Sequence, residues 1–167
     1  MPSSDLTLER NLSWQLGLAL VGVVAFCLYS RSWKDLPHLV YDVPASLAVF
    51  AFVAQLVLEA RSPGHWFWMG RAGLLVAMTV VTVGREFRSW PISGHLSCVL
   101  AVAIVQLADP RLHPGERLLY WIPLPVVLGI RWWLFDRGAH GQTYNAMLFA
   151  VAGAVPVVLI ARLLVAR

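Results

Sequence analysis

The stretch that decides the fold is PASLAVFAFVAQLVLEA, residues 44–60, in which Glu59 is the single charged side chain. Its apolar residues form one continuous block, without the 3.6-residue or two-residue alternation of an amphipathic helix or a half-buried strand. A block of about 18 to 20 apolar residues is long enough to cross a hydrocarbon core of roughly 30 Å. We therefore predict a membrane-crossing helix here.

Five further apolar blocks flank this one, at residues 13–30, 66–84, 93–108, 118–135 and 145–164. The connections between them are short and polar, and Pro123 and Pro125 are expected to bend the fifth block. No basic cluster precedes the first block, so we expect it to be retained rather than cleaved as a signal peptide. The pattern predicts an all-α fold, a single polytopic bundle of six transmembrane helices over residues 1–167.

The overall composition also favours a membrane protein. The chain is 59% hydrophobic and only 13% charged, whereas soluble domains carry about 25% charged residues. Eight Trp are typical of a chain that meets the membrane interface. The net charge of +4 comes from single basic residues rather than runs, which argues against a nucleic-acid partner. Cys27 and Cys98 lie inside apolar blocks and are interpreted as small hydrophobic residues.

The order of the crossings sorts the loops into two sets. Two crossings separate residues 85–94 from residues 136–144, so these loops lie on one side of the membrane, together with residues 31–42. Both termini lie on the other side. With the phosphate-binding candidates set aside, the excess of positive charge predicts cytoplasmic termini and an outward-facing site, as in a bacterial inner membrane.

The first set of loops contains the residues that are candidates for catalysis. One His can attack phosphorus as a nucleophile, and a second can protonate the leaving oxygen. Arg side chains and the amides of a helix N-terminus would stabilise the charge on the phosphoryl oxygens. The set comprises Arg85, Glu86, Arg88, Ser93, Gly94, His95, Arg137 and His140, with Arg131 near the end of the fifth block.

At these residues the chain resembles the type 2 phosphatidic acid phosphatase (PAP2) superfamily of membrane lipid phosphatases. The stretch RSWPISGH, residues 88–95, resembles the family's Pro-Ser-Gly-His motif, with Ile92 inserted between Pro and Ser. The stretch RGAH, residues 137–140, resembles the run into its third motif. The last four apolar blocks also match the family's order of helices and motifs.

The resemblance implies a role for each matched residue. His140 would be the nucleophile that forms a phosphohistidine, and His95 would be the general acid. The phosphate-binding residues would be Arg85, Arg88, Ser93, Gly94, Arg131 and Arg137. This chemistry requires no metal and no organic cofactor.

Two positions depart from the family's pattern. The Asp expected four residues after His140 is replaced by Tyr144, so Glu86 and Asp136 are the candidates to orient that imidazole. The third-motif Arg is expected at position 134, which is Leu134, while Arg131 lies one helical step earlier on roughly the same face.

The expected function is a lipid-phosphate phosphatase or phosphotransferase whose partners are its lipid substrate and the surrounding membrane lipids. One alternative is a catalytically inactive PAP2-like protein that binds lipid phosphates or acts as a scaffold. In another, His95 and His140 are interfacial residues and the Arg side chains anchor helix ends. A transporter subunit would more often carry intramembrane carboxylates or broken helices. Arg71, inside the third block, is expected to snorkel or to pair with Glu59.

Overall fold

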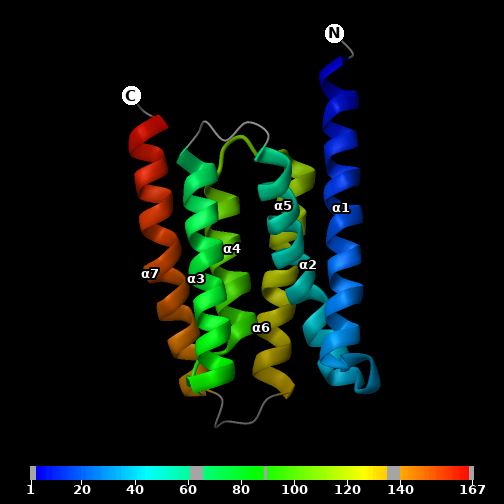
Figure 1. Ribbon diagram of the computed structural model, residues 1–167, viewed down its shortest axis with the longest axis vertical. Coiled ribbons are helices and arrows are strands. Elements are labelled where there is room, and N and C mark those ends of the chain that lie inside the picture. The colour runs from blue at the N-terminus through cyan, green and yellow to red at the C-terminus, as the bar shows by residue number, and fades with distance from the viewer. Residues whose placement is uncertain (1–2, 61–65, 89, 135–139, 166–167) are drawn as a thin grey trace.

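The computed structural model describes residues 3–60, 66–88, 90–134 and 140–165 (Figure 1). Within these ranges all regular structure is helical, which confirms the predicted all-α class. The elements are α1 (Ser3–Ser30), the 3-10 turn η1 (Ser32–Lys34), α2 (Leu36–Glu59), α3 (Trp66–Arg88), α4 (Gly94–Ala108), α5 (Pro114–Trp121), α6 (Pro123–Leu134) and α7 (His140–Val165).

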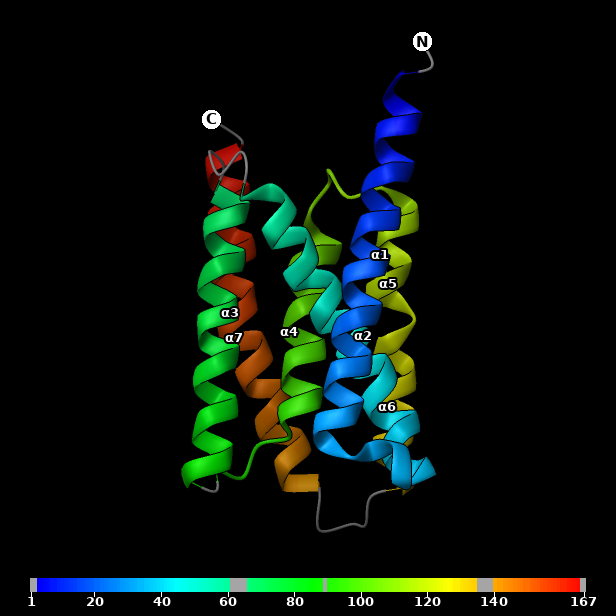
Figure 2. The ribbon, with the colours of Figure 1, turned by 45° about the vertical axis from the view of Figure 1, so that its right-hand side comes forward.

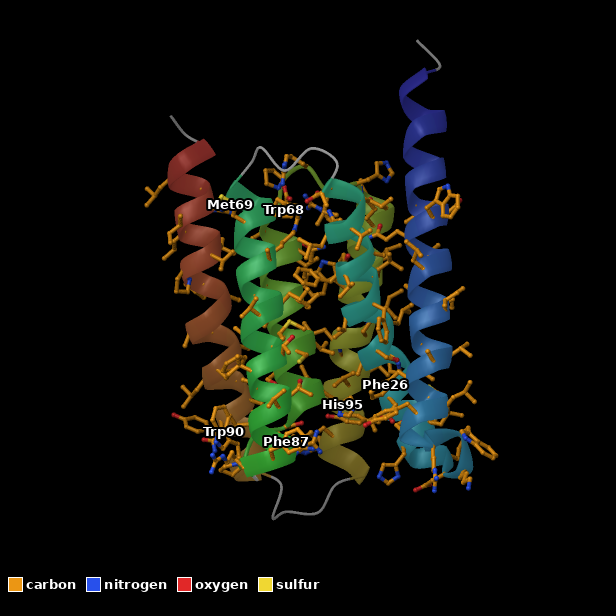
Figure 3. All side chains as sticks on the ribbon, in the orientation of Figure 1. Phe26, Trp68, Met69, Phe87, Trp90 and His95 are labelled. Carbon is orange, nitrogen blue, oxygen red and sulfur yellow. The ribbon has the colours of Figure 1, made fainter. Side chains whose placement is uncertain are left out.

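The helices form an up-and-down bundle in which α5 and α6 follow one another as a single rod (Figures 1 and 2). Both chain termini lie at one end of the bundle, which we call the termini end. The other end holds the last turn of α3 and the first turns of α2, α4 and α7 (Figure 1). We call it the His95 end, after the residue that lies there in Figure 3.

Several helices extend beyond the apolar blocks. The hydropathy pattern predicts starts at Ser13 and Pro44, but α1 begins at Ser3 and α2 at Leu36. Likewise α3 continues past Gly84 to Arg88, and α7 begins at His140 rather than at residue 145. Hydropathy marks where a helix is apolar, whereas backbone hydrogen bonding continues into its polar ends. The residues near 85–88 are therefore helical and not part of a loop.

The fifth predicted helix is in fact two helices. It begins at Pro114, four residues before the predicted start, because His113 and Glu116 form a capping box. In this box Gly115 N donates to His113 Nδ1 (3.2 Å), and His113 N donates to a Glu116 carboxylate oxygen (3.0 Å). The expected bend near Pro123 is a break at Ile122, between α5 and α6.

Helix α4 is the centre of the bundle and packs against α2, α3, α5, α6 and α7. Leu96, Val99 and Val102 on α4 are completely buried. Ala146, Ala150 and Ala154 form a fully buried stripe of small side chains on the neighbouring α7, which allows close backbone approach. By contrast α1 packs mainly against α2, and most of its apolar side chains are exposed.

A buried ionic cluster joins four segments near the termini end. Arg71 of α3 is fully buried, and its Nη1 and Nη2 lie 2.6 Å from Glu59 Oε2 and 2.5 Å from Asp109 Oδ2. The predicted pairing of Arg71 with Glu59 is thus confirmed. Arg71 Nε also donates to Gln106 Oε1 (2.7 Å), and Gln106 in turn donates to Gln55.

The cluster is closed on both sides by further hydrogen bonds. Gln15 of α1 donates to the hydroxyl of Tyr120 (3.0 Å), which donates to Gln55. Asp109 also accepts from Arg111. No buried side-chain nitrogen or oxygen among the described residues lacks a hydrogen-bond partner. Such a complete network fits a structural tie between helices rather than an open transport pathway.

The electrostatics of the adjoining loop agree with this interpretation. Burial alone would raise the pKa of Asp109, but hydrogen bonds from Arg111 and the charges of Arg71 and Arg111 outweigh it. The pKa of the Asp109 carboxyl is therefore below its ordinary value. The hydrogen bond to Asp109 correspondingly raises the pKa of Arg111. Asp109 is held as a carboxylate at neutral pH.

Two helices in the described part of the chain are long and apolar enough to cross a membrane, over Leu12–Ser30 and His38–Glu59. Shorter apolar helices cover Gly94–Ala108 and Tyr144–Ile160. By composition and length, the structure therefore supports a membrane-associated chain.

Candidate functional site

The predicted Ser-Gly-His stretch begins α4, with Ser93 as its N-cap residue in an extended conformation. The Ser93 hydroxyl does not cap the helix; it lies 3.3 Å from the hydroxyl of Tyr41 on α2, in hydrogen-bond contact. Ser93 and Gly94 are both buried. The first turn of α4 is therefore packed against α2 rather than projecting freely from the bundle.

His95 is held by an ion-pair contact with a carboxylate. Its Nε2 lies 3.1 Å from Oδ1 of Asp42 on α2, and the Asp42 side chain is only 8% exposed. The Ser30 hydroxyl, at the end of α1, donates to the other carboxylate oxygen of Asp42 (3.4 Å). The imidazole is thus attached through Asp42 to two neighbouring helices.

Two aromatic rings fix the plane of this imidazole. Tyr41 lies with its ring centroid 5.0 Å from that of His95, and Phe26 meets it edge to face at 5.9 Å. Figure 3 shows Phe26 and His95 pointing toward one another between their helices. One quarter of the His95 side chain remains exposed. The ring is oriented on one side and open on another, as a reacting group must be.

Three of the four predicted Arg residues have described side chains, and they lie in different surroundings. Arg85, on the last turn of α3, lies over the start of α4: a Cβ on Gly94 would be 3.1 Å from Arg85 Nη1. Arg131 is buried on α6, one turn before that helix ends. Arg88 is exposed at the end of α3, where a positive charge favourably faces the helix dipole. The structure thus places Arg85 against the Gly94 backbone, in the turn of α4 that also carries Ser93 and His95.

The loop before α4 is anchored at two points. The Trp90 ring covers Gly84 of α3, where a Cβ would lie 2.6 Å from Trp90 Cε3. Asn145 Nδ2 of α7 donates to the carbonyl oxygen of Pro91 (2.9 Å). These contacts connect the Ser-Gly-His turn to both α3 and α7.

Other predicted site residues lie partly or wholly outside the described residues. Asp136 and Arg137 are among them, and for Glu86 and His140 only the backbone is described. His140 is the first residue of α7, so its backbone lies at the same end of the bundle as His95 (Figure 1).

The position at which the PAP2 pattern has its Asp carries no carboxylate. Tyr144 occupies it and is 63% exposed, while the amide of Asn145 is bonded to Pro91. Among the residues whose side chains are described, the carboxylate next to a candidate His is Asp42, and its partner is His95.

The sequence alone does not mark Asp42, Tyr41, Phe26 or Ser30 as site residues. Because the apolar block begins at Pro44, its pattern predicts that Asp42 ends a loop. A lone carboxylate directly before a membrane-length apolar block was the available signal, because a helix that starts earlier would bury it. Nothing in the local sequence of Ser30 or Phe26 marks them, since only the packing of α1 on α2 brings them near.

No group of three His, Cys, Asp or Glu side chains in the described part of the chain is placed to hold a metal ion. The arrangement is instead suited to acid–base or nucleophilic chemistry on an anion, with an oriented imidazole at His95 and a guanidinium group against the Gly94 backbone of the same turn. No protein-family model, no curated protein and no solved structure matches this chain.

Proposed function

We propose that the chain is a six-crossing membrane protein that hydrolyses or transfers a phosphate group on a lipid through a phosphohistidine. The observation that carries this proposal is the His95 imidazole, held by the buried Asp42 at the start of α4, where Arg85 lies against Gly94. His140 begins α7 at the same end of the bundle, and provides the second imidazole that the chemistry needs.

The outer surface of the bundle supports the membrane setting. Large apolar side chains are exposed along α1, α3 and α7, for example Val24, Val80 and Leu159. Soluble monomers rarely expose contiguous apolar patches beyond about 300–600 Å², whereas lipid tails solvate such a surface. The helices satisfy their own backbone hydrogen bonds, as the bilayer interior requires.

Each group at the His95 end has a place in phosphoryl transfer. An imidazole nitrogen attacks phosphorus, and a second imidazole protonates the departing oxygen. Arg85, Ser93 and the Gly94 amide stabilise the phosphoryl oxygens, with Arg88, Arg131 and Arg137 as further phosphate-binding residues. The resemblance to the PAP2 superfamily assigns the attack to His140 and the proton to His95.

The substrates we propose are lipid phosphates presented at the membrane surface. They include phosphatidic acid, phosphatidylglycerol phosphate, polyprenyl phosphates or pyrophosphates and phosphorylated glycolipids. The charge distribution favours cytoplasmic termini, which would expose the His95 end on the outer face of a bacterial inner membrane.

The test is phosphate release by the purified protein in detergent from a panel of these lipids. Replacing His95 or His140 by Ala should lower turnover at least about a hundredfold, because each removes an essential proton or nucleophile. The matched control is His38→Ala, which removes an exposed His at the same end that pairs with Asp35, and it should keep wild-type turnover.

A wild-type protein that binds these lipids and releases no phosphate would contradict the proposal. That result would favour the alternative, a PAP2-like protein that binds lipid phosphates without turnover or acts as a scaffold. The Tyr at position 144 would then mark the lost catalytic carboxylate.

A further inference from the structure

Asp42 is placed so that it selects the tautomer of a neutral His95 ring. The carboxylate is buried, and one oxygen faces His95 Nε2 while the other accepts from Ser30. A carboxylate accepts hydrogen bonds and cannot donate them. The His95 tautomer with hydrogen on Nε2 is therefore stabilised, and Nδ1 is left with its lone pair.

A ring nitrogen with a free lone pair is what nucleophilic attack requires, and the opposite carboxylate is what stabilises the resulting cation. A general acid needs the reverse, a proton on the nitrogen that faces the substrate. In a neutral His95 ring, the one proton is directed at Asp42. The neutral ring can therefore attack through Nδ1, whereas proton donation from that nitrogen would require the imidazolium form.

The aromatic contacts strengthen this orientation. Phe26 and Tyr41 contact the His95 ring from α1 and α2, and these contacts hold the plane of the ring. At the position where the resemblance places an Asp, by contrast, Tyr144 is exposed. The neighbouring Asn145 donates a hydrogen bond to the carbonyl oxygen of Pro91. Among the side chains that the structure describes, the carboxylate that orients a candidate His therefore comes from α2.

We propose that His95 is the nucleophile and Asp42 its positioning residue, so that the two His residues exchange the roles that the resemblance implies. This inference rests on the proposed function. His95 Nδ1 forms a bond to phosphorus while the bond from phosphorus to the lipid oxygen breaks. The lipid oxygen takes a proton from His140, and the His95 imidazolium keeps its Nε2 hydrogen directed at Asp42.

The second half-reaction returns the site to its starting state. His140, now neutral, accepts a proton from water as the water oxygen bonds to phosphorus. The P–N bond to His95 breaks, its electron pair returns to Nδ1, and inorganic phosphate leaves. Where another alcohol replaces water, the same steps give phosphoryl transfer.

The first measurement identifies the phosphorylated residue in the wild-type protein. The protein is mixed with phosphatidic acid in detergent micelles, quenched at alkaline pH to preserve phosphohistidine, and digested for mass spectrometry. Phosphate on His95 is the expected result. Phosphate on His140 would overturn the inference and leave the proposed function intact, whereas a wild type that turns over no lipid phosphate refutes the proposed function itself.

The second measurement separates nucleophile from general acid by the leaving group. The phenolate of 4-nitrophenyl phosphate departs without protonation. A protein without its general acid should therefore still release 4-nitrophenolate in a rapid first phase (the burst), in an amount equal to the amount of protein. His140→Ala should keep the burst and lose lipid turnover, while His95→Ala should lose both. A missing burst in folded His140→Ala, or a retained burst in His95→Ala, would overturn the assignment.

The third measurement concerns Asp42 itself. Asp42→Asn should lower kcat at least about a hundredfold with KM changed less than about threefold, because Asn can reverse the tautomer without removing the side chain. Asp42→Glu should restore part of kcat. The matched control is Asp35→Asn, which removes the carboxylate beside the exposed His38 at the start of the same helix.

A role for Asp42 in folding alone would show as a lower unfolding temperature with normal kcat in the folded fraction. That result, or equal kcat in Asp42→Asn and Asp35→Asn, would overturn the positioning role.

Discussion

Gly84 is the residue on which the loop before α4 rests. The Trp90 ring covers its Cα so closely that a Cβ would lie 2.6 Å from Cε3 and 2.7 Å from Cδ2. An indole ring is rigid, so it cannot yield as a flexible side chain would. Trp90 in turn precedes Pro91, whose carbonyl oxygen accepts a hydrogen bond from Asn145. The absence of one methyl group thus determines how the Ser-Gly-His turn is held.

Replacing Gly84 by Ala should destabilise the protein even though Ala is the better helix former. The gain in helix propensity is about 1 kcal/mol, but overpacking costs about 1–3 kcal/mol and would displace Trp90. Gly73→Ala in the same helix is the matched control, because nothing lies within 4 Å of its Cβ position. Thermal unfolding in detergent should show a lower midpoint for Gly84→Ala only; equal midpoints would contradict the close packing.

Asp42 shows the limit of inference from single residues. The sequence predicts a site that contains His95 and His140, and it shows Tyr144 where the resemblance places an Asp. It does not indicate that the end of α1 and the first turns of α2 enclose His95. Those contacts join residues more than fifty positions apart in the chain, so no local motif can encode them.

At the scale of elements, Arg71 ties α3 to both α2 and α4. The side chain is completely buried and contacts Glu59 at the end of α2, Gln106 within α4 and Asp109 directly after it. Both carboxylates contact this one guanidinium, while Glu59 also accepts from Gln55 and Asp109 also pairs with Arg111. Buried charges of this kind stabilise little as a group but are costly to separate.

Arg71→Met should therefore lower the free energy of unfolding by about 3–5 kcal/mol, because it leaves Glu59 without its ion pair and Asp109 with a weaker one. Arg162→Met, which replaces an exposed Arg near the end of α7, should change stability by less than about 0.5 kcal/mol. Urea unfolding in mixed micelles measures both. Similar values for the two variants would mean that Arg71 contributes no more than a surface charge.

At the scale of the whole molecule, six antiparallel rods place two chemically different ends on the bundle (Figure 2). The termini end carries the closed ionic cluster, whose members satisfy one another. The His95 end carries the imidazole, the Arg85 guanidinium and the start of α7. Under the proposed function, a substrate at a membrane surface would meet only one of these ends, so the direction of insertion would decide which lipid leaflet the protein serves.

The proposed topology predicts opposite labelling of the two ends. In a background with Cys27 and Cys98 replaced by Ala, Lys34→Cys lies at the His95 end and Pro110→Cys at the termini end, and both positions are exposed. A membrane-impermeant maleimide should label Lys34→Cys in intact cells and Pro110→Cys only after permeabilisation. Labelling of both in intact cells would contradict the six crossings, and labelling of Pro110→Cys alone would reverse the proposed orientation.

The sequence by itself determined the helical class and the positions of the apolar segments, because burial of long apolar blocks is a local property of the chain. It also indicated the Ser-Gly-His turn and the Arg71–Glu59 pair, whose residue types and spacing are visible without coordinates. The predicted ends of the helices were less accurate than the predicted helices themselves. At both α1 and α2 the hydrogen-bonded helical backbone begins before the apolar stretch.

Only the tertiary structure decided which partner orients which His. The pairing of Asp42 with His95, the aromatic contacts from Phe26 and Tyr41, and the support of Trp90 on Gly84 all arise where separate helices pack. The physical reason is that hydropathy specifies which residues leave water, whereas the direction and neighbours of a polar side chain depend on the register between helices, and that register is a property of the packed bundle.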